Sequence, residues 1–264
     1  VWPGVPIGLY AEYWYRHPPP PPDFDPDFAG AAAIDPLRFP LLNAPTLMSM
    51  SSAVAGWSPT QWQADTYPTP WRERIRVIHD GIDTRVLKPD PAVSVRLGGP
   101  EGLRLTRTDE VVTFVNRNLE PARGYHILMR ALPRLLRERP AAQVLLVGGD
   151  GASYGPPPAR GSWKQRFIDE VRPLLAPSEW KRVHFLGRLP YAQYVAVLQL
   201  SRAHVYLTYP FVLSWSLLEA MSIGCPVVAS DVDPVREVVS DGQTGLLAPF
   251  ADADALAGPL ARLL

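Results

Sequence analysis

Two arginines, Arg117 and Arg123, stand six residues apart between a short apolar run and a segment in which apolar residues have helical spacing. Guanidinium groups form charge-assisted hydrogen bonds with phosphate oxygens, and the first turn of a helix offers backbone N–H groups to an anion. Together with Gly124, which follows directly, the two arginines could therefore bind a pyrophosphate. Two solvated surface arginines would satisfy the same pattern, and position alone does not separate the two interpretations.

A second polar pair, Ser216 and Glu219, lies in an apolar segment and has the spacing of a helix capping box. In one interpretation Glu219 accepts a hydrogen bond from the backbone N–H of Ser216 and only caps the helix. In the other, Glu219 faces a cleft and binds ribose hydroxyls. Both hold together only if the helix begins elsewhere, for instance with Ser214 as its N-cap, and the spacing by itself favours the cap.

The sequence offers no clear pattern for a metal site or a His–Asp dyad. His79 and Asp80 are adjacent, and neighbouring side chains on a strand point apart, so this Asp-Gly segment is interpreted as a turn. The acidic stretch with Asp25 and Asp27 lacks the glycine and the terminal Glu of a calcium loop. No Cys/His spacing fits zinc, and the single cysteine, Cys225, is interpreted as a small buried hydrophobe. We therefore expect no metal.

The elements that must position these candidates follow from periodicity. From residue 110 onward, short apolar runs alternate with segments of helical spacing, which predicts βαβ units and a doubly wound, Rossmann-like α/β domain with a parallel sheet. Ligands of such sheets bind at the carboxyl ends of the strands, where both polar constellations lie. The expected strands are 111–115, 143–147, 183–186, 204–208, 226–230 and 244–248. The expected helices lie near 127–136, 163–175, 191–200, 216–223 and 235–239.

Residues 1–108 lack this regular alternation of apolar runs and helical segments. They are rich in proline, and the run from Pro18 to Pro22 favours a stiff extended loop. The sequence thus predicts a partial, irregular N-terminal domain with a linker over 1–108, and the Rossmann-like domain over 109–264. The chain opens without Met in what is interpreted as a strand and stops within a helical pattern, so we expect both ends to be cut.

Bulk composition limits the kinds of partner. Lys and Arg number 26, as do Asp and Glu, so no net charge favours nucleic acid, and an anion must be held by a local site. One cysteine allows no intrachain disulfide. The chain shows neither a signal peptide nor an apolar stretch of spanning length. A cytoplasmic protein is expected, with peripheral attachment to a membrane surface left open.

Five segments in order, taken together, resemble the retaining glycosyltransferases with two Rossmann-like domains, known as glycosyl transferases group 1 or family 4. This family includes many bacterial hexosyl- and mannosyltransferases. The resemblance extends from about residue 75 to the end, and the chain has no counterpart of the glycine-rich loop that opens the family fold. The segments are 79–83, 115–124, 185–189, 218–230 and 237–247.

The resemblance implies a site for a nucleotide-diphosphate sugar, which is a co-substrate, and it implies no cofactor and no metal. Arg117, Arg123 and Gly124 would bind the donor diphosphate, and the arginines would stabilise charge on the leaving group. Glu219 would be the second Glu of a two-glutamate motif and would bind ribose, which reverses the preference for a cap. Backbone amides would approach the donor near Leu213, Ser214 and Trp215.

The chain departs from the family pattern in its first glutamate. Phe211 occupies the position, eight residues before Glu219, where the family has that Glu, so a contact to the donor sugar is missing or supplied differently. The strand from Ile7 to Tyr10 resembles a late strand of the first domain, where the family often presents a His. Glu12 stands near that place and is the candidate catalytic residue, with a structural Glu in a proline-rich loop as the equal alternative.

The implied activity is transfer of a sugar from a nucleotide-diphosphate donor to a hydroxyl acceptor, either a glycan or a lipid-linked one, with retention of anomeric configuration. Two alternatives stay open: a non-catalytic nucleotide-sugar-binding fragment, and a nucleotide-sugar epimerase of similar fold. A dinucleotide dehydrogenase is not expected, because no Gly-x-Gly-x-x-Gly follows a strand.

Overall fold

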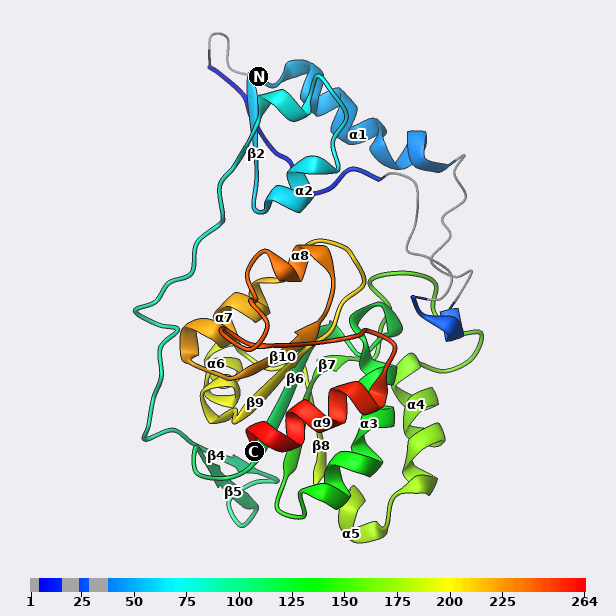
Figure 1. Cartoon of the computed structure of the whole chain (residues 1–264), viewed down its shortest axis with the longest axis vertical. Coiled ribbons are helices and arrows are strands. Elements are labelled where there is room, and N and C mark those ends of the chain that lie inside the picture. The colour runs from blue at the N-terminus through cyan, green and yellow to red at the C-terminus, as the bar shows by residue number, and fades with distance from the viewer. Residues whose placement is uncertain (1–4, 16–23, 29–37) are drawn as a thin grey trace. The chain divides into compact units, whose positions relative to one another are not determined.

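The computed structural model describes residues 5–15, 24–28 and 38–264, and the proline run at 18–22 lies outside this part. The chain divides into two compact units (Figure 1). Unit one comprises Val1–Gly81, Pro210–Leu213 and Val232–Val238. Unit two comprises Ile82–Tyr209, Ser214–Asp231 and Val239–Leu264.

Unit two is built on a six-stranded parallel sheet of order β11-β10-β9-β6-β7-β8, which confirms the predicted doubly wound α/β fold. Its strands are β6 (Val111–Asn118), β7 (Gln143–Gly149), β8 (Val183–Gly187), β9 (Ala203–Tyr206), β10 (Val227–Ser230) and β11 (Leu246–Ala248). Its helices are η4 (Pro121–Arg123), α3 (Tyr125–Glu138), α4 (Trp163–Val171), η5 (Arg172–Leu174), α5 (Pro177–Trp180), α6 (Tyr191–Leu200), α7 (Trp215–Ile223) and α9 (Ala253–Leu263).

The strands of this sheet are apolar on both sides because helices cover both faces. On one face, Val115 of β6 shares a hydrophobic cluster with Leu198 of α6 and Ile223 of α7. Toward the other face, the ring of Phe114 lies 6.4 Å from that of Tyr125 on α3. Helices α3, α4 and α9 lie together on that second side (Figure 1).

The order of the strands creates a reversal that matters for ligand binding. From β6 the chain adds β7 and then β8 on one side, and it returns to place β9 on the other side of β6. At such a switch point the segments that follow the two central strands leave toward opposite faces of the sheet and open a crevice. The carboxyl ends of β6 and β9 therefore define where a ligand would bind.

Two of the element boundaries that differ from the sequence prediction are the ends of α4 and β9. The helix expected near 163–175 ends as an α-helix at Val171 and continues as η5, because Pro173 has no N–H to donate to the preceding turn. The strand expected over 204–208 ends at Tyr206, so Thr208 lies in the segment that follows β9.

Unit one is more regular than its proline content suggested. It contains a parallel sheet of order β1-β2-β3 and a small core of Ala11, Met50, Ala64, Tyr67 and Ile75. The strands are β1 (Gly8–Tyr10), β2 (Ala55–Ser58) and β3 (Ile75–Val77). The helices are η1 (Pro26–Phe28), α1 (Phe39–Ser52), α2 (Gln61–Asp65), η3 (Arg72–Arg74) and α8 (Asp233–Arg236).

The segment between the two sheets forms an antiparallel hairpin of β4 (Ser94–Leu97) and β5 (Leu103–Thr106). Leu105 of this hairpin is buried in the same cluster as α6 and α7, so the hairpin packs into unit two. The sequence pattern places this hairpin within residues 1–108, in the N-terminal domain. The domain boundary between residues 108 and 109 itself stays a prediction.

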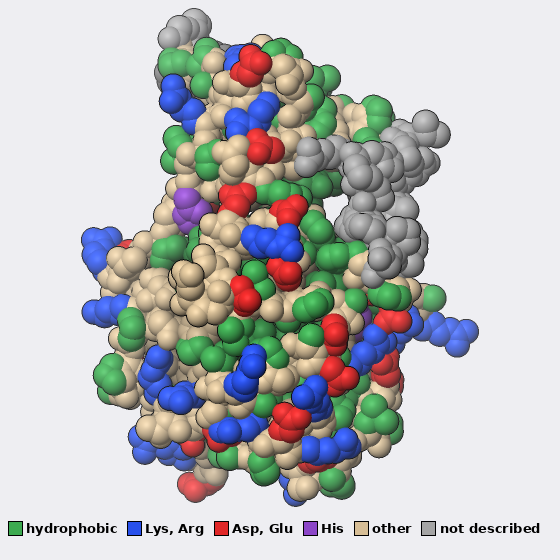
Figure 2. All heavy atoms as spheres, viewed as in Figure 1, with side chains coloured by type: hydrophobic (Ala, Val, Ile, Leu, Met, Phe, Trp, Pro, Cys, Tyr) green, Lys and Arg blue, Asp and Glu red, His purple; other side chains and the backbone are tan. Residues whose placement is uncertain are grey.

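Two surface properties bear on partners. Among the described residues, no helix is long and apolar enough to cross a membrane. Acidic and basic side chains are interspersed over the face of the molecule in view in Figure 2. On that face the charge is mixed, so a bound anion again has to be held by particular side chains.

His204, on β9, should make stability depend on pH. The side chain is completely buried, its Nδ1 lies 2.9 Å from the Thr113 hydroxyl, and burial lowers the pKa of His204 from 6.5 to about 4. Between these two values the unfolded chain binds the proton more readily, so stability present above pH 6.5 is lost as the pH falls toward 4.

His204→Asn, which keeps a hydrogen-bonding group near Nδ1, should reduce this loss by up to about 1.4 kcal/mol per pH unit. Urea unfolding at several pH values within that window measures the slope. His79→Asn, at an exposed histidine, is the control and should keep the wild-type slope. An unchanged slope in His204→Asn would show that His204 does not titrate between the folded and unfolded states as inferred.

Candidate functional site

The carboxyl end of β6 presents Arg117. This side chain is exposed and forms no hydrogen bond or ion pair with any residue in the described ranges. It is the second-last residue of β6 and lies next to the switch point between β6 and β9. Arg117 is therefore available to a ligand at the edge of the sheet where ligands of this fold class bind.

Arg123 has a different environment from Arg117. It is the last residue of η4 and is only 5% exposed. Its Nη1 donates to the Thr208 hydroxyl at 2.7 Å, and its guanidinium lies over the ring of Tyr154, 4.6 Å from the centroid. Thr208 follows β9, so this hydrogen bond spans the switch point. Arg123 is not a solvated surface arginine, and its position is fixed by contacts with the segments that follow β7 and β9.

The N-terminus of α7 is tied to the same place through Tyr206. The Ser214 N–H donates to the buried Tyr206 hydroxyl at 2.8 Å, and the Ser214 hydroxyl caps the helix by accepting from the Ser216 N–H. Burial raises the pKa of Tyr206, while the charge of Arg123 acts in the opposite direction. Tyr206 thus lies close to the Arg123 guanidinium and links it to the first turn of α7.

Glu219 does not cap α7, so the preference for a cap drawn from spacing alone is wrong. The helix begins at Trp215 with Ser214 as its N-cap, which places Glu219 beyond the first turn. The carboxylate accepts hydrogen bonds from two phenols instead: from Tyr191 at 3.2 Å to Oε1, and from Tyr194 to Oε2.

A buried carboxylate, Glu120, organises the segment that follows β7. Its Oε2 accepts the backbone N–H groups of Ser153 at 2.8 Å and of Tyr154 at 2.9 Å. Burial raises the pKa of Glu120, and these two hydrogen bonds and the charge of Arg123 oppose that effect. Glu120 therefore holds Tyr154 where its ring can cover Arg123. Sequence reasoning missed Glu120, although its place between the two arginines was a signal.

The remaining predicted residues divide between the units. Trp215 opens α7 in unit two and is 60% exposed. Leu213 and Glu12 belong to unit one, and Gln63 contacts both of them: its Oε1 accepts the Leu213 N–H at 3.4 Å, and its Nε2 donates to the Glu12 carbonyl at 2.8 Å. The Glu12 side chain is exposed. The part played by each predicted site residue in binding or catalysis stays a prediction.

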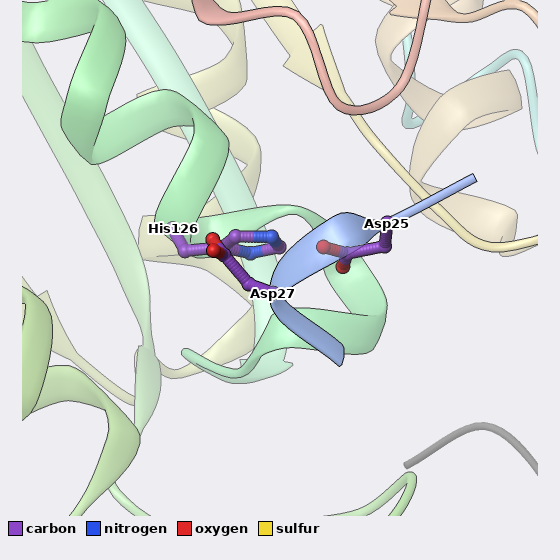
Figure 3. A group of neighbouring side chains, drawn as sticks. All are labelled: Asp25, Asp27 and His126. Atoms are coloured by element: carbon purple, nitrogen blue, oxygen red, sulfur yellow. The ribbon is translucent and has the colours of Figure 1, made fainter. Parts of the chain in front are cut away.

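Figure 3 shows the elements that carry three further acidic and imidazole side chains. Asp25 and Asp27 lie at η1 in unit one, and His126 is buried in the first turn of α3 in unit two. The His126 ring packs against Phe167 and Phe250, with centroids 5.5 and 5.9 Å away. The expectation that the chain uses no metal stays a prediction.

Comparison with known families decides where the chain belongs. Residues 101–264 match the family of glycosyl transferases group 1, and residues 1–87 match the glycosyl transferase family 4 group. The chain belongs to the glycosyl transferases group 1 family. The resemblance inferred from the five sequence segments is thus confirmed.

The curated relatives of this family member are longer proteins. It is 34% identical over 162 residues to the phosphatidyl-myo-inositol mannosyltransferase of Mycolicibacterium smegmatis, covering 60% of this chain and 37% of that protein. It is 33% identical over 201 residues to the D-inositol 3-phosphate glycosyltransferase of Nocardia farcinica, covering 73% of this chain and 42% of that protein. The chain thus spans less than half the length of these two relatives.

Solved structures of longer proteins share its fold. Anabaena HepE, solved in complex with UDP and glucose, matches with a TM-score of 0.64 and 20% identity over 84% of this chain and 56% of that one. Sucrose-phosphate synthase from Thermosynechococcus elongatus matches with a TM-score of 0.66 and 22% identity over 88% of this chain and 54% of that one. At these identities the likeness shows the fold.

Gly124 is required by a close approach of two backbone segments at the switch point. It joins η4 to α3 with φ of 69°, and a Cβ built there would lie 2.3 Å from the Leu207 Cβ. Leu207 follows β9, so only a residue without a side chain lets the turn after β6 approach the segment after β9. The predicted diphosphate segment therefore depends on Gly124 for its position.

Gly124→Ala should destabilise unit two more than a positive φ alone would. Gly242 has φ of 71° with nothing within 4 Å of a built Cβ, so Gly242→Ala measures the cost of the backbone conformation, roughly 1–2 kcal/mol. Gly124→Ala adds the steric contact with Leu207 and should lose roughly 1–3 kcal/mol more. Chemical unfolding of both variants makes the comparison. Equal losses would mean that the contact with Leu207 relaxes freely.

Proposed function

We propose that this chain is part of an enzyme that transfers a sugar from a nucleotide-diphosphate donor to a hydroxyl acceptor with retention of anomeric configuration. The observation that carries the proposal is the arrangement of Arg117 and Arg123 at the switch point. Arg123 is fixed there by Thr208, and Arg117 is free of described partners. Family membership supports the reaction class.

The donor diphosphate would lie against the two arginines and the first turn of α3. A guanidinium carries five N–H donors, and that of Arg123 bonds to the Thr208 hydroxyl and to the Tyr206 hydroxyl. The other donors would be left for phosphate oxygens. Since the reaction releases a nucleoside diphosphate, positive charge at this place stabilises the leaving group as its bond to the sugar breaks.

In the transfer, the bond between the anomeric carbon and the diphosphate oxygen breaks, and the acceptor oxygen bonds to that carbon on the same face. The acceptor proton passes to an oxygen of the leaving phosphate, so no protein base is obligatory. What the protein must supply is orientation of the sugar and support for positive charge at its ring. We propose Glu12 for that part, and backbone amides near Leu213, Ser214 and Trp215 for the donor.

The relatives support particular substrates to test. HepE was solved with UDP and glucose, so a uridine-diphosphate sugar is the first donor to try. Two curated relatives are named for inositol-based acceptors, which supports a hydroxyl of a glycan or of a lipid-linked polyol as acceptor. A cytoplasmic location and peripheral contact with a membrane belong to the same proposal.

A non-catalytic nucleotide-sugar-binding fragment is the second candidate, and Phe211 favours it. Phe211 stands where the family has its first Glu, and its ring makes a T-shaped contact with Tyr13, with centroids 4.7 Å apart. Incubation with a panel of nucleotide sugars and hydroxyl acceptors, followed by product analysis, separates the candidates. Release of nucleoside diphosphate together with a glycosylated acceptor supports the transferase, and isomerised donor would indicate an epimerase.

Arg117→Ala should weaken binding of UDP by about tenfold to a hundredfold, because a charge-assisted contact to phosphate is worth roughly 1.5–3 kcal/mol. Binding of uridine should hardly change, and stability should be kept because the side chain is exposed. Calorimetric titration with both ligands measures the difference. Arg202→Ala is the matched control, since Arg202 is exposed at the amino end of β9, and it should bind both as the wild type does. Equal weakening of UDP and uridine by Arg117→Ala would refute the diphosphate assignment.

Glu12→Gln, in the full enzyme that contains this chain, should lower turnover by ~10²-fold or more with little change in donor affinity, since it removes charge near the sugar. The fold should be kept, because Gln63 bonds to the Glu12 backbone and the side chain is exposed. Initial rates at saturating donor give the turnover. Glu101→Gln, in the exposed turn between β4 and β5, is the control. A Glu12→Gln variant that works at the parental rate would remove Glu12 from the mechanism.

A further inference from the structure

The first turn of α6 supplies both hydrogen-bond donors to Glu219. Tyr191 and Tyr194 are three residues apart on this helix and so share one face. The Tyr191 hydroxyl lies 3.2 Å from Oε1, the Tyr194 hydroxyl donates to Oε2, and the two ring centroids are 5.8 Å apart. One carboxylate on α7 is therefore held at both oxygens by one face of α6.

We propose that Tyr191 and Tyr194 are positioning residues that orient the Glu219 carboxylate toward the ribose diol, and that they set a preference for ribonucleotide donors. This inference rests on the proposed function, because it requires a nucleotide in the crevice. It goes beyond that proposal by naming residues on α6 that no motif indicated and by assigning them selectivity for the sugar of the nucleotide.

The capacity of the carboxylate fits this role. An ionised carboxylate accepts hydrogen bonds at about four lone-pair positions, two on each oxygen. The two phenols occupy one position on each oxygen, which leaves one on each for a ligand. A ribose presents two neighbouring hydroxyl donors, and these match one remaining position on each oxygen. A single hydroxyl would use only one of the two remaining acceptor positions.

The helices hold the tyrosines and the glutamate in a fixed relation. Leu198 of α6 and Ile223 of α7 are buried in one hydrophobic cluster against the sheet. Tyr194 is partly buried, and burial together with its hydrogen bond to Glu219 raises its pKa, so its hydroxyl remains a donor at neutral pH. A glutamate held in this way has less rotamer freedom to lose when ribose binds.

Selectivity for the diol separates this role from simple support of α7. If the phenols only hold the two helices together, their removal lowers stability and weakens all nucleotides alike. If they orient Glu219, their removal weakens the ribonucleotide and spares an analogue without the diol. The ratio of affinities for UDP and 2′,3′-dideoxy-UDP is therefore the decisive quantity, with thermal unfolding recorded for each variant.

The experiment is calorimetric titration of the wild type, Tyr194→Phe, Tyr191→Phe/Tyr194→Phe and Glu219→Gln with both nucleotides. The wild type should prefer UDP, and Tyr194→Phe should reduce the preference by about threefold to tenfold, the double variant by more. Affinity for the dideoxy analogue should change less than about twofold. Adding Tyr194→Phe to Glu219→Gln should cause little further loss, because both changes act through the same carboxylate.

Each other outcome overturns the inference. An unchanged preference in the double phenylalanine variant, or equal weakening of both nucleotides, would show that the tyrosines do not orient Glu219 toward ribose. Tyr67→Phe, which removes a phenol hydroxyl in unit one, is the control and should keep the preference. If the wild type binds none of UDP, GDP and ADP, the proposed function fails first, and that result is distinguishable from a failure of the tyrosine variants alone.

Discussion

The hydrogen bond from Arg123 to Thr208 crosses the place where the sheet of unit two reverses its strand order. Where successive strands are added on the same side, the segments that follow them all cross to the same face of the sheet. At the reversal, the segments after β6 and β9 leave toward opposite faces. Here the buried Arg123 guanidinium joins these two segments. Gly124 lets the turn after β6 approach Leu207, which follows β9. Both contacts join segments that are far apart in the sequence, so they hold the chain after β6 against the chain after β9.

Burial of Arg123 has an electrostatic consequence. Glu120 lies close enough for the Arg123 charge to lower its pKa, although burial raises that pKa more strongly. The Arg123 guanidinium thus lies near a buried carboxyl group, whereas Arg117 is exposed. The two arginines therefore differ in environment: Arg123 is buried and bonded to Thr208, and Arg117 is exposed.

The sequence could predict the parallel sheet and the edge at which the site lies, because buried strands and amphipathic helices follow periods that each segment carries in itself. The sequence could not predict which arginine is buried, because the burial of Arg123 depends on Thr208 and Tyr154, which belong to other loops. The prediction from spacing alone that Glu219 caps the helix was wrong for the same reason. The choice of Ser214 over Ser216 as N-cap is fixed by the hydroxyl of Tyr206, a contact across a turn that residue spacing does not record.

Phe211, which the resemblance places where the family has its first glutamate, packs within unit one. The Phe211 ring contacts that of Tyr13, which in turn stacks on Trp62 with centroids 6.0 Å apart, so aromatic contacts hold this loop. Gln63 is 1% exposed and bonds to both the Leu213 N–H and the Glu12 carbonyl. The loop that carries Phe211 and the segment that carries Glu12 are thereby fixed to one buried side chain. In the proposed function Phe211 offers the donor sugar no polar contact, and Glu12 is the acidic residue of the segment that Gln63 joins to the same loop.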